Sequence, residues 1–326
     1  MNVKNETKLY ITLSILCIAI ISLLNLLLPE SHFKESLYRK DILERITISK
    51  GVYDPLVVLS SLFYLLFFVF GTVNLIIFIL NKFHKRPLLK INELVIAFDL
   101  KTKEASQLLF SIVYLYLVFY LLVVGLITQD NLSQTYYLSI FLIFNLIINV
   151  VVIILIIKFI PLKFLGIKYK LNHFISTFRL YSSIIPLIYI ITVLITSFGE
   201  KFEIYPSYHP AVYILLALKN KWLMFILILE IIILAPLCEE LFFRGFIFKL
   251  ARNRFGFILS STITSLFFSL LHRSFFGFFV IFLISMAACF LYEKTQNILA
   301  SFAFHSLHNS LGIIYVFIIK KLIAGQ

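Results

Sequence analysis

Residues 222–248 read WLMFILILEIIILAPLCEELFFRGFIF, an apolar run long enough to cross a lipid bilayer. Two adjacent glutamates, Glu239 and Glu240, stand inside this run, and Arg244 follows four residues after the second. A charged side chain near the bilayer centre costs about 2.5–3.5 kcal/mol on insertion scales. We therefore interpret these ionisable residues as parts of a functional site.

The rest of the chain has the composition of an integral membrane protein. Of its 326 residues, 61% are hydrophobic and only 14% are charged, and its mean hydropathy is +1.01. A soluble domain carries about 25% charged residues. We expect an all-α, polytopic transmembrane bundle of eight or nine spans. The predicted spans are 9–28, 56–80, 107–128, 136–160, 180–198, 222–248, 256–273, 275–292 and 296–319.

The formal net charge is +13, from 29 basic and 16 acidic residues. Basic residues gather in three short segments between apolar runs, at 81–105, 161–179 and 249–255, and their alternation predicts cytoplasmic loops. Such loops favour anionic lipid headgroups as partners, and we expect no nucleic acid. The expected location is the cell membrane, as a multi-pass protein. The abundance of Lys, Ile, Asn and Phe is typical of an AT-rich bacterial genome.

The three cysteines, Cys17, Cys238 and Cys289, all fall in apolar runs and show neither metal nor disulfide spacing. A thiol in apolar surroundings is a poor nucleophile. We interpret all three as core-filling residues.

The two glutamates are expected to have different tasks. Adjacent residues on a helix point about 100° apart, so Glu239 and Glu240 cannot share a face. Glu240 and Arg244 are four residues apart and can form an ion pair. Glu239 is then free to face a cavity, where a buried carboxylate can act as a general base or acid. Pro236 removes one backbone hydrogen bond and is expected to kink the helix beside them.

Two later apolar segments also carry polar side chains. His305 and Asn309 are four residues apart, share a helix face and both donate hydrogen bonds, which suits a developing oxyanion. His272 is expected to orient or share an attacking water with Glu239. At 1.5 Å per residue these side chains lie at depths of roughly 14–24 Å, so helix tilt can bring them together. His308, on the same turn as His305, is interpreted as a bystander.

Three motifs in order, Glu239–Glu240–x–x–x–Arg244, Phe268–x–x–x–His272 and His305–x–x–x–Asn309, resemble the CPBP family. This family groups type II CAAX prenyl endopeptidases with bacteriocin-processing and Abi proteins. The resemblance covers about residues 180–319. We therefore divide the chain into N-terminal spans with cytoplasmic loops, 1–179, and a catalytic core, 180–326.

The resemblance implies an intramembrane endopeptidase that hydrolyses a peptide bond of a membrane-associated protein or peptide precursor. It implies that Glu239 and His272 activate water, and that His305 and Asn309 hold the oxyanion. Glu240, Arg244 and Phe268 would support them. An alternative is a non-catalytic membrane scaffold, or a bacteriocin self-immunity protein that retains the motifs.

Metal dependence stays open at this stage. Glu239, His272 and His305 could hold zinc, whereas Asn309 is a poor zinc ligand. We expect that no cofactor is required, with zinc as the alternative. A transporter that uses Glu239 as a proton relay is disfavoured, because the sequence has no internal repeat.

Overall fold

The computed structural model describes residues 3–27, 55–84, 89, 100–127, 134–167, 170–202, 210–272 and 274–324. Every regular element in these ranges is helical, which confirms the all-α class. A helix satisfies all its backbone groups internally, as a chain in lipid must. Most of the predicted loop 81–105 lies outside the described residues.

Six helical stretches in the described part of the chain are long and apolar enough to cross a membrane, and the chain is a membrane protein. They are Val58–Phe83, Thr102–Val123, Ser139–Phe159, Leu171–Lys201, Lys221–Leu271 and Phe275–Thr295. The fifth contains two of the predicted spans. Helices α1 (Val3–Leu27) and α13 (Ile298–Ala324) also match predicted spans but are not among the six, so the count of eight or nine stays a prediction.

The chain forms two compact units, each assembled from segments that are distant in the sequence. The first comprises Met1–Arg39, Phe98–Pro161 and Asn220–Cys238, and the second Lys40–Ala97, Leu162–Lys219 and Glu239–Gln326. The boundary between Cys238 and Glu239 falls just before the glutamate pair. The predicted division at residue 180 stays a prediction.

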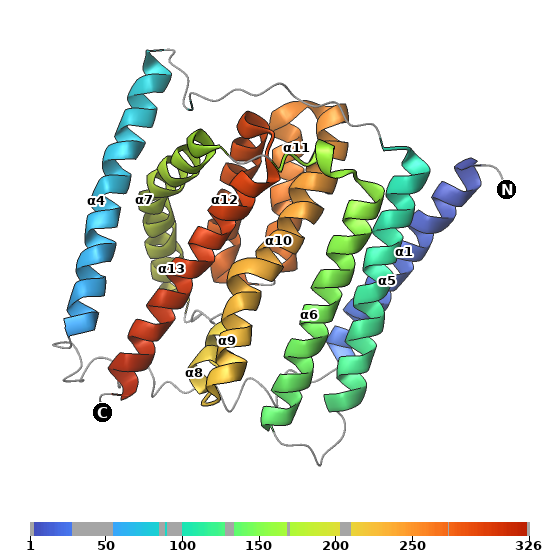
Figure 1. The fold of residues 1–326 in the computed structure, drawn as a ribbon, viewed down its shortest axis with the longest axis horizontal. Helices are drawn as coiled ribbons and strands as arrows, with labels where there is room; N and C mark the ends of the chain where they lie inside the picture. Colours follow the sequence, from blue (N-terminus) through green and yellow to red (C-terminus); the bar gives the residue numbers. More distant parts are fainter. Residues whose placement is uncertain are drawn as a thin grey trace. The chain divides into compact units, whose positions relative to one another are not determined.

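In the first unit, neighbouring helices pack in sequence order and lie side by side in Figure 1. Asn149 on α6 donates a hydrogen bond to Glu230 Oε1 at 2.5 Å, which ties α6 to the helix that follows Asn220. The elements are α1 (Val3–Leu27), α5 (Thr102–Ile127), α6 (Gln134–Phe159), α9 (Lys221–Leu229) and the π-helical turn η3 (Glu230–Leu234).

The second unit packs around a core shared by α7, α12 and α13, in which Leu291, Ala300 and Phe304 are fully buried. The main elements are α4 (Pro55–Phe83), α7 (Leu171–Lys201), α8 (Pro210–Ala217), the π-helical η4 (Leu241–Phe248), α11 (Lys249–Leu271), α12 (Phe275–Thr295) and α13 (Ile298–Ala324); a short 3₁₀ turn, η2, covers Leu162–Phe164. All three cysteines are buried free thiols, which agrees with a core-filling role.

The helix that carries the glutamate pair departs from regular α geometry on both sides of α10 (Ala235–Glu240). The Ala235 N–H donates to the Glu230 carbonyl, five residues back, which is the hydrogen bond of a π-helix. Pro236 was predicted to kink this helix, and the deviation beside it is a widening to π-helix. Since π turns gather at functional sites, this irregularity marks the segment that holds Glu239 and Glu240.

The prediction of a loop over residues 249–255 is wrong, because α11 already begins at Lys249. Lys249 is buried, donates a hydrogen bond to the Phe164 carbonyl and lies over the Tyr292 ring. Within α11 the helix is interrupted at Gly256, where the backbone has a φ of 70° and a ψ of 177° and the chain changes direction. A positive φ is readily adopted only by glycine. Beyond Gly256 the chain packs back against η4.

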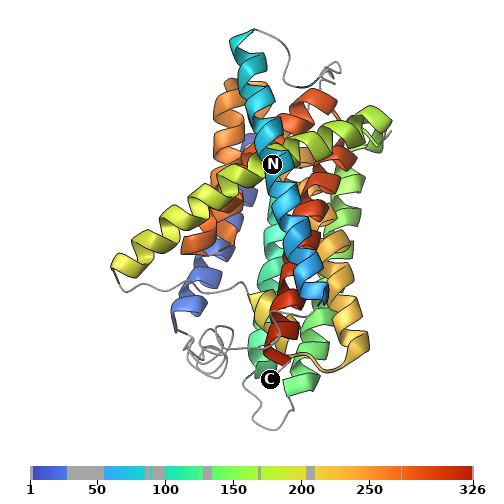
Figure 2. The same cartoon turned by 90° about the vertical axis from the view of Figure 1, so that its left-hand side faces the viewer.

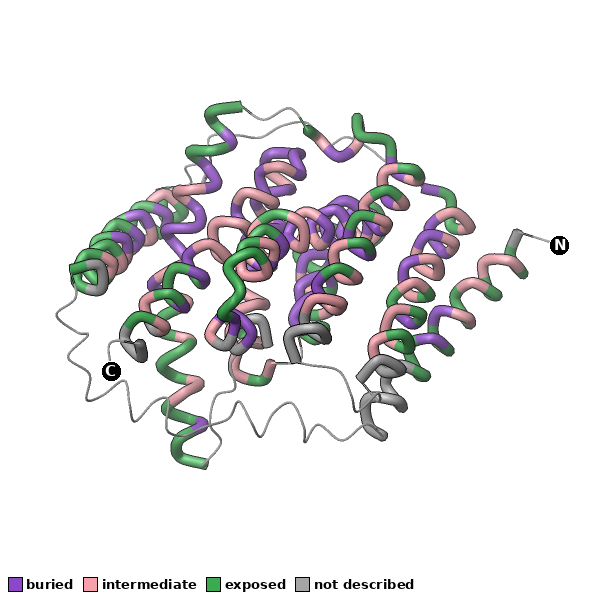
Figure 3. The backbone as a smooth tube through the Cα atoms, turned by 60° about the horizontal axis from the view of Figure 1, so that its bottom comes forward, coloured by how far each residue is buried: buried purple, intermediate pink, exposed green. Residues whose placement is uncertain are grey.

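Most helices combine buried with exposed residues, as Figure 3 shows by colour. Many exposed residues are large and apolar, for example Leu66 on α4 and Ile258 on α11, which are 68% and 76% exposed. A soluble monomer rarely exposes such continuous apolar surface. These faces are therefore suited to lipid.

Polar contacts and one close approach hold α4 to its neighbours. Asn74 donates to Ser182 Oγ on α7 at 2.9 Å, and Tyr64 donates to the Leu311 carbonyl on α13 at 2.6 Å. Figure 2 shows α4 crossing α7. At Gly71 the two helices come so close that a Cβ atom would clash with the Ser182 carbonyl oxygen. Small residues of this kind let membrane helices pack backbone to backbone.

We predict that Gly71→Ala lowers stability, because the added methyl group forces α4 away from α7. Overpacking of this kind costs about 1–3 kcal/mol. The matched control is Gly312→Ala on α13, where an added Cβ meets no atom within 4 Å. Thermal unfolding of the detergent-solubilised variants should show a loss for Gly71→Ala only. Equal unfolding temperatures for both would contradict this packing.

Candidate active site

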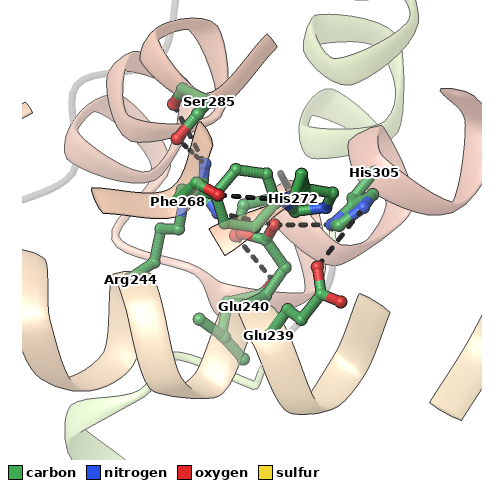
Figure 4. Close-up of polar contacts among 9 residues, drawn as sticks. Glu239, Glu240, Arg244, Phe268, His272, Ser285 and His305 are labelled. Carbon is green, nitrogen blue, oxygen red and sulfur yellow. Dashed lines mark hydrogen bonds and ion pairs between the residues drawn. The ribbon is translucent and has the colours of Figure 1, made fainter. Parts of the chain in front are cut away.

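The predicted site residues come together within the second unit, from three places in the sequence (Figure 4). Glu239 and Glu240 end α10, and Arg244 lies in η4. Phe268 and His272 stand at the end of α11, and His305 stands on α13. The sequence motifs therefore describe one cluster, although its members are up to 66 residues apart.

The predicted ion pair between Glu240 and Arg244 is present and completely buried. Arg244 Nη1 lies 2.9 Å from Glu240 Oε1, and each side chain is 1% exposed. Arg244 Nη2 also donates to the backbone carbonyl and the hydroxyl of Ser285, at 3.0 and 2.8 Å. Breaking a buried pair leaves an uncompensated charge, so the contacts reinforce one another. They fix η4 against α12.

His305 lies between the two glutamates. Its Nδ1 is 3.0 Å from Glu240 Oε1, and its Nε2 is 3.8 Å from Glu239 Oε2. A carboxylate paired with a guanidinium can only accept a hydrogen bond, so Nδ1 carries a proton and donates it. Glu240 thus orients the ring so that its other nitrogen faces Glu239.

His272 terminates α11, and its Nδ1 lies 2.8 Å from the carbonyl oxygen of Phe268, one turn earlier. Because a carbonyl only accepts, the proton of a neutral His272 sits on Nδ1 and Nε2 is left as an acceptor. The spacing Phe–x–x–x–His therefore has a direct structural reason. The residue four positions before the histidine supplies the carbonyl that sets its tautomer.

The Phe268 ring packs between the charged groups and the histidines. Its centroid lies 4.6 Å from that of His272 and 5.8 Å from that of His305. The Arg244 guanidinium carbon lies 5.1 Å from the same ring, within the range of a cation–π contact. The ring is 3% exposed, so it keeps water from the inner side of the cluster.

The two glutamates differ sharply in exposure. The Glu239 side chain is 34% exposed, whereas that of Glu240 is 1% exposed. Glu239 is thus the more exposed of the two side chains, although its Oε2, which faces His305, is buried. Asn309 lies one turn beyond His305 on α13 and is partly buried. Its role at the oxyanion stays a prediction.

Ser285 is a member of the cluster that the sequence reasoning missed. It lies on α12, in a span without a motif residue, and it is fully buried. A serine in an apolar helix is too common to signal a site, because its hydroxyl can bond to its own helix backbone. The structure reveals its role, because α12 packs against η4 and Ser285 there accepts two hydrogen bonds from the Arg244 guanidinium.

The zinc alternative requires at least three side chains that converge on one ion. Among the described residues, no three His, Cys, Asp or Glu side chains converge as metal ligands. Zinc sites hold at least three such ligands at about 2.0–2.3 Å. We therefore derive no step through a metal. The expectation that no cofactor is required stays a prediction.

Comparison with known proteins places this cluster in a recognised segment. Residues 220–311 match the family described as Type II CAAX prenyl endopeptidase Rce1-like. The match runs from the residue that caps α9 into α13 and contains all three motifs, which confirms the resemblance seen in the sequence. No curated protein and no solved structure matches the chain.

We predict that Arg244→Ala and Glu240→Gln both reduce the amount and thermal stability of folded protein. Removing one partner of a buried pair costs about 3–5 kcal/mol. The control is Arg252→Ala, which removes an ion pair to Glu293 of the same 2.9 Å length but with side chains 32% and 15% exposed. Exposed pairs contribute about 0–1 kcal/mol. Unfolding temperatures measured in detergent check this. If all three variants unfold at the same temperature as the parent, the buried ion pair does not stabilise the fold.

Proposed function

We propose that this chain, whose residues 220–311 form a domain of the Rce1-like type II CAAX prenyl endopeptidase family, is an intramembrane endopeptidase. That family is a family of proteases. The observation that carries the proposal is the chain of contacts from Arg244 through Glu240 and His305 to Glu239, which lies wholly inside the matched segment. Its substrate is a membrane-associated protein or peptide precursor.

The charges in the cluster support His305 as an electrophilic donor. Two carboxylates and one guanidinium leave one net negative charge in largely buried surroundings. In its imidazolium form, His305 balances this charge and presents an Nε2–H to Glu239. Preorganised donors of this kind stabilise an oxyanion strongly where water is excluded. We assign His305, together with Asn309, to the carbonyl oxygen of the scissile bond.

Glu239 and His272 are assigned to the attacking water. Glu239 is the exposed carboxylate, and the Nε2 of His272 is an acceptor because Nδ1 donates to Phe268. Glu239 takes one proton as the water oxygen attacks the carbonyl carbon. The tetrahedral intermediate then collapses, the C–N bond breaks, and the same proton passes from Glu239 to the leaving amine. Water supplies every atom that the products gain.

The surroundings suit a substrate that reaches the site from the membrane. Both glutamates and Phe268 lie on Lys221–Leu271, a stretch long and apolar enough to span a bilayer, and the predicted eight or nine spans would surround the cluster with lipid. Basic loops favour anionic headgroups. Since bacteria seldom prenylate proteins, we favour a peptide precursor or membrane protein over a prenylated CAAX substrate.

We predict that Glu239→Gln lowers kcat by about 10²–10⁴-fold, because the amide cannot accept the proton of water. Two fluorogenic reporters in phosphatidylglycerol-containing vesicles provide the assay, a farnesylated CAAX peptide and an unprenylated peptide with a hydrophobic leader. The matched control is Glu230→Gln, nine residues earlier in the same helical run, which removes a buried carboxylate bound to Asn149. It should keep kcat within a few-fold.

Full activity of Glu239→Gln would remove this residue from the mechanism. Comparing peptide termini in membranes of cells that express the parent or Glu239→Gln would identify natural substrates. If the parent cleaves neither the reporters nor any membrane protein, the scaffold or self-immunity alternative gains support.

A separate prediction concerns metal. Because no group of three possible metal ligands converges among the described residues, purified protein should carry no stoichiometric zinc and should keep its activity after chelation. Elemental analysis and assays after chelator treatment check this. One zinc per chain that is lost in His272→Ala would contradict the metal-free mechanism.

A further inference from the structure

A second histidine on α13, His308, forms a contact that none of the three motifs includes. Its Nδ1 lies 3.1 Å from the hydroxyl of Tyr181 on α7. Tyr181 is 3% exposed, and its ring packs edge-on against Phe304 at 5.3 Å between centroids. The hydroxyl is therefore held in place by the core of the second unit. The interpretation of His308 as a bystander did not anticipate this contact.

The hydrogen bond sets the tautomer of His308. Among the described residues, His308 Nδ1 is the hydrogen-bond partner of the Tyr181 hydroxyl. A buried hydroxyl that does not donate its proton loses a hydrogen bond, so the favourable arrangement has Tyr181 donating and Nδ1 accepting. The proton of a neutral His308 then sits on Nε2. The ring presents a fixed donor, with its acceptor nitrogen already occupied.

His308 belongs to the surroundings of the active site. It lies three residues after His305 and one before Asn309, so the three side chains share a face of α13. His305 and His272 are both close enough to act on it electrostatically. The His305 Nε2 faces Glu239, and the His272 Nε2 is an acceptor. His308 thus adds a donor beside His305, whereas His272 offers an acceptor to the water.

We propose that His308 is a catalytic residue that donates a hydrogen bond from Nε2 to the peptide carbonyl oxygen, and that Tyr181 is the positioning residue that fixes it. This inference rests on the proposed endopeptidase function. Oxyanion binding then involves three side chains of one helix, His305, His308 and Asn309. The charge that develops on the oxygen is shared among them.

Kinetics of four variants on whichever reporter the parent cleaves test the catalytic part. His308→Leu should lower kcat by about 10²-fold with KM changed only a few-fold, as for an oxyanion donor. His308→Gln keeps an amide N–H and should recover most of that loss. Tyr181→Phe should lower kcat roughly tenfold, since it removes one hydrogen bond. Unchanged kcat in His308→Leu would overturn the catalytic assignment.

The matched control is Tyr64→Phe. Its hydroxyl also donates to α13, at the Leu311 carbonyl three residues beyond His308, so its bond is to the backbone and not to a histidine ring. It should lower the unfolding temperature about as much as Tyr181→Phe and leave kcat unchanged. Equal loss of kcat in both tyrosine variants would overturn the positioning role, because the effect would then come from a loosened α13.

A spectroscopic readout separates this inference from the proposed function. In ¹⁵N-histidine-labelled protein, the His308 signal, assigned by its absence in His308→Gln, should have the pattern of an Nε2–H tautomer. In Tyr181→Phe it should shift toward a mixture of tautomers. An Nδ1–H tautomer in the parent would overturn the proposal without any activity measurement. A parent that cleaves no reporter would instead contradict the endopeptidase function and, with it, the catalytic role of His308.

Discussion

The buried ion pair between Glu240 and Arg244 is the constraint on which the site depends. Both side chains are 1% exposed, and the guanidinium also donates hydrogen bonds to the carbonyl and hydroxyl oxygens of Ser285 on α12. A lone charge at this position would be expensive in lipid, so each group stays only while its partners are present. The pair thus joins α10, η4 and α12. Its carboxylate also orients His305 by accepting a hydrogen bond from Nδ1.

Function follows from how this carboxylate is shared. Glu240 binds Arg244 and His305 with the same oxygen, which turns the imidazole toward the more exposed Glu239. The π-helical turns on both sides of α10 place the two glutamates, and Phe268 closes the inner side with its ring while its carbonyl sets the tautomer of His272. A rigid, water-excluding support for one accessible carboxylate is what hydrolysis within a membrane requires.

Sequence reasoning predicted the Glu240–Arg244 ion pair better than the backbone that holds it. The spacing of Glu240 and Arg244 predicted their pairing, since four residues make one helical turn, and the apolar runs predicted an all-α membrane protein. The prediction of a loop over 249–255 was wrong. Lys249 is buried by contacts with the Phe164 carbonyl and the Tyr292 ring, and both residues are distant from it in the sequence. Ser285 and the Tyr181–His308 contact were missed for the same reason. Each unit is also assembled from segments that are distant in the sequence. Such an assembly leaves no local sequence pattern from which it could be predicted.

In the proposed mechanism, Glu239 and His305 both meet the scissile peptide bond. A structure of the Glu239→Gln variant in lipid nanodiscs, bound to an uncleaved reporter peptide, would show where that bond lies. Our account predicts that the scissile carbonyl carbon lies beside residue 239, with its oxygen in hydrogen-bond reach of His305 Nε2 and the Glu240–Arg244–Ser285 contacts unchanged. A peptide bound with its scissile bond beyond the reach of both residues would contradict the account.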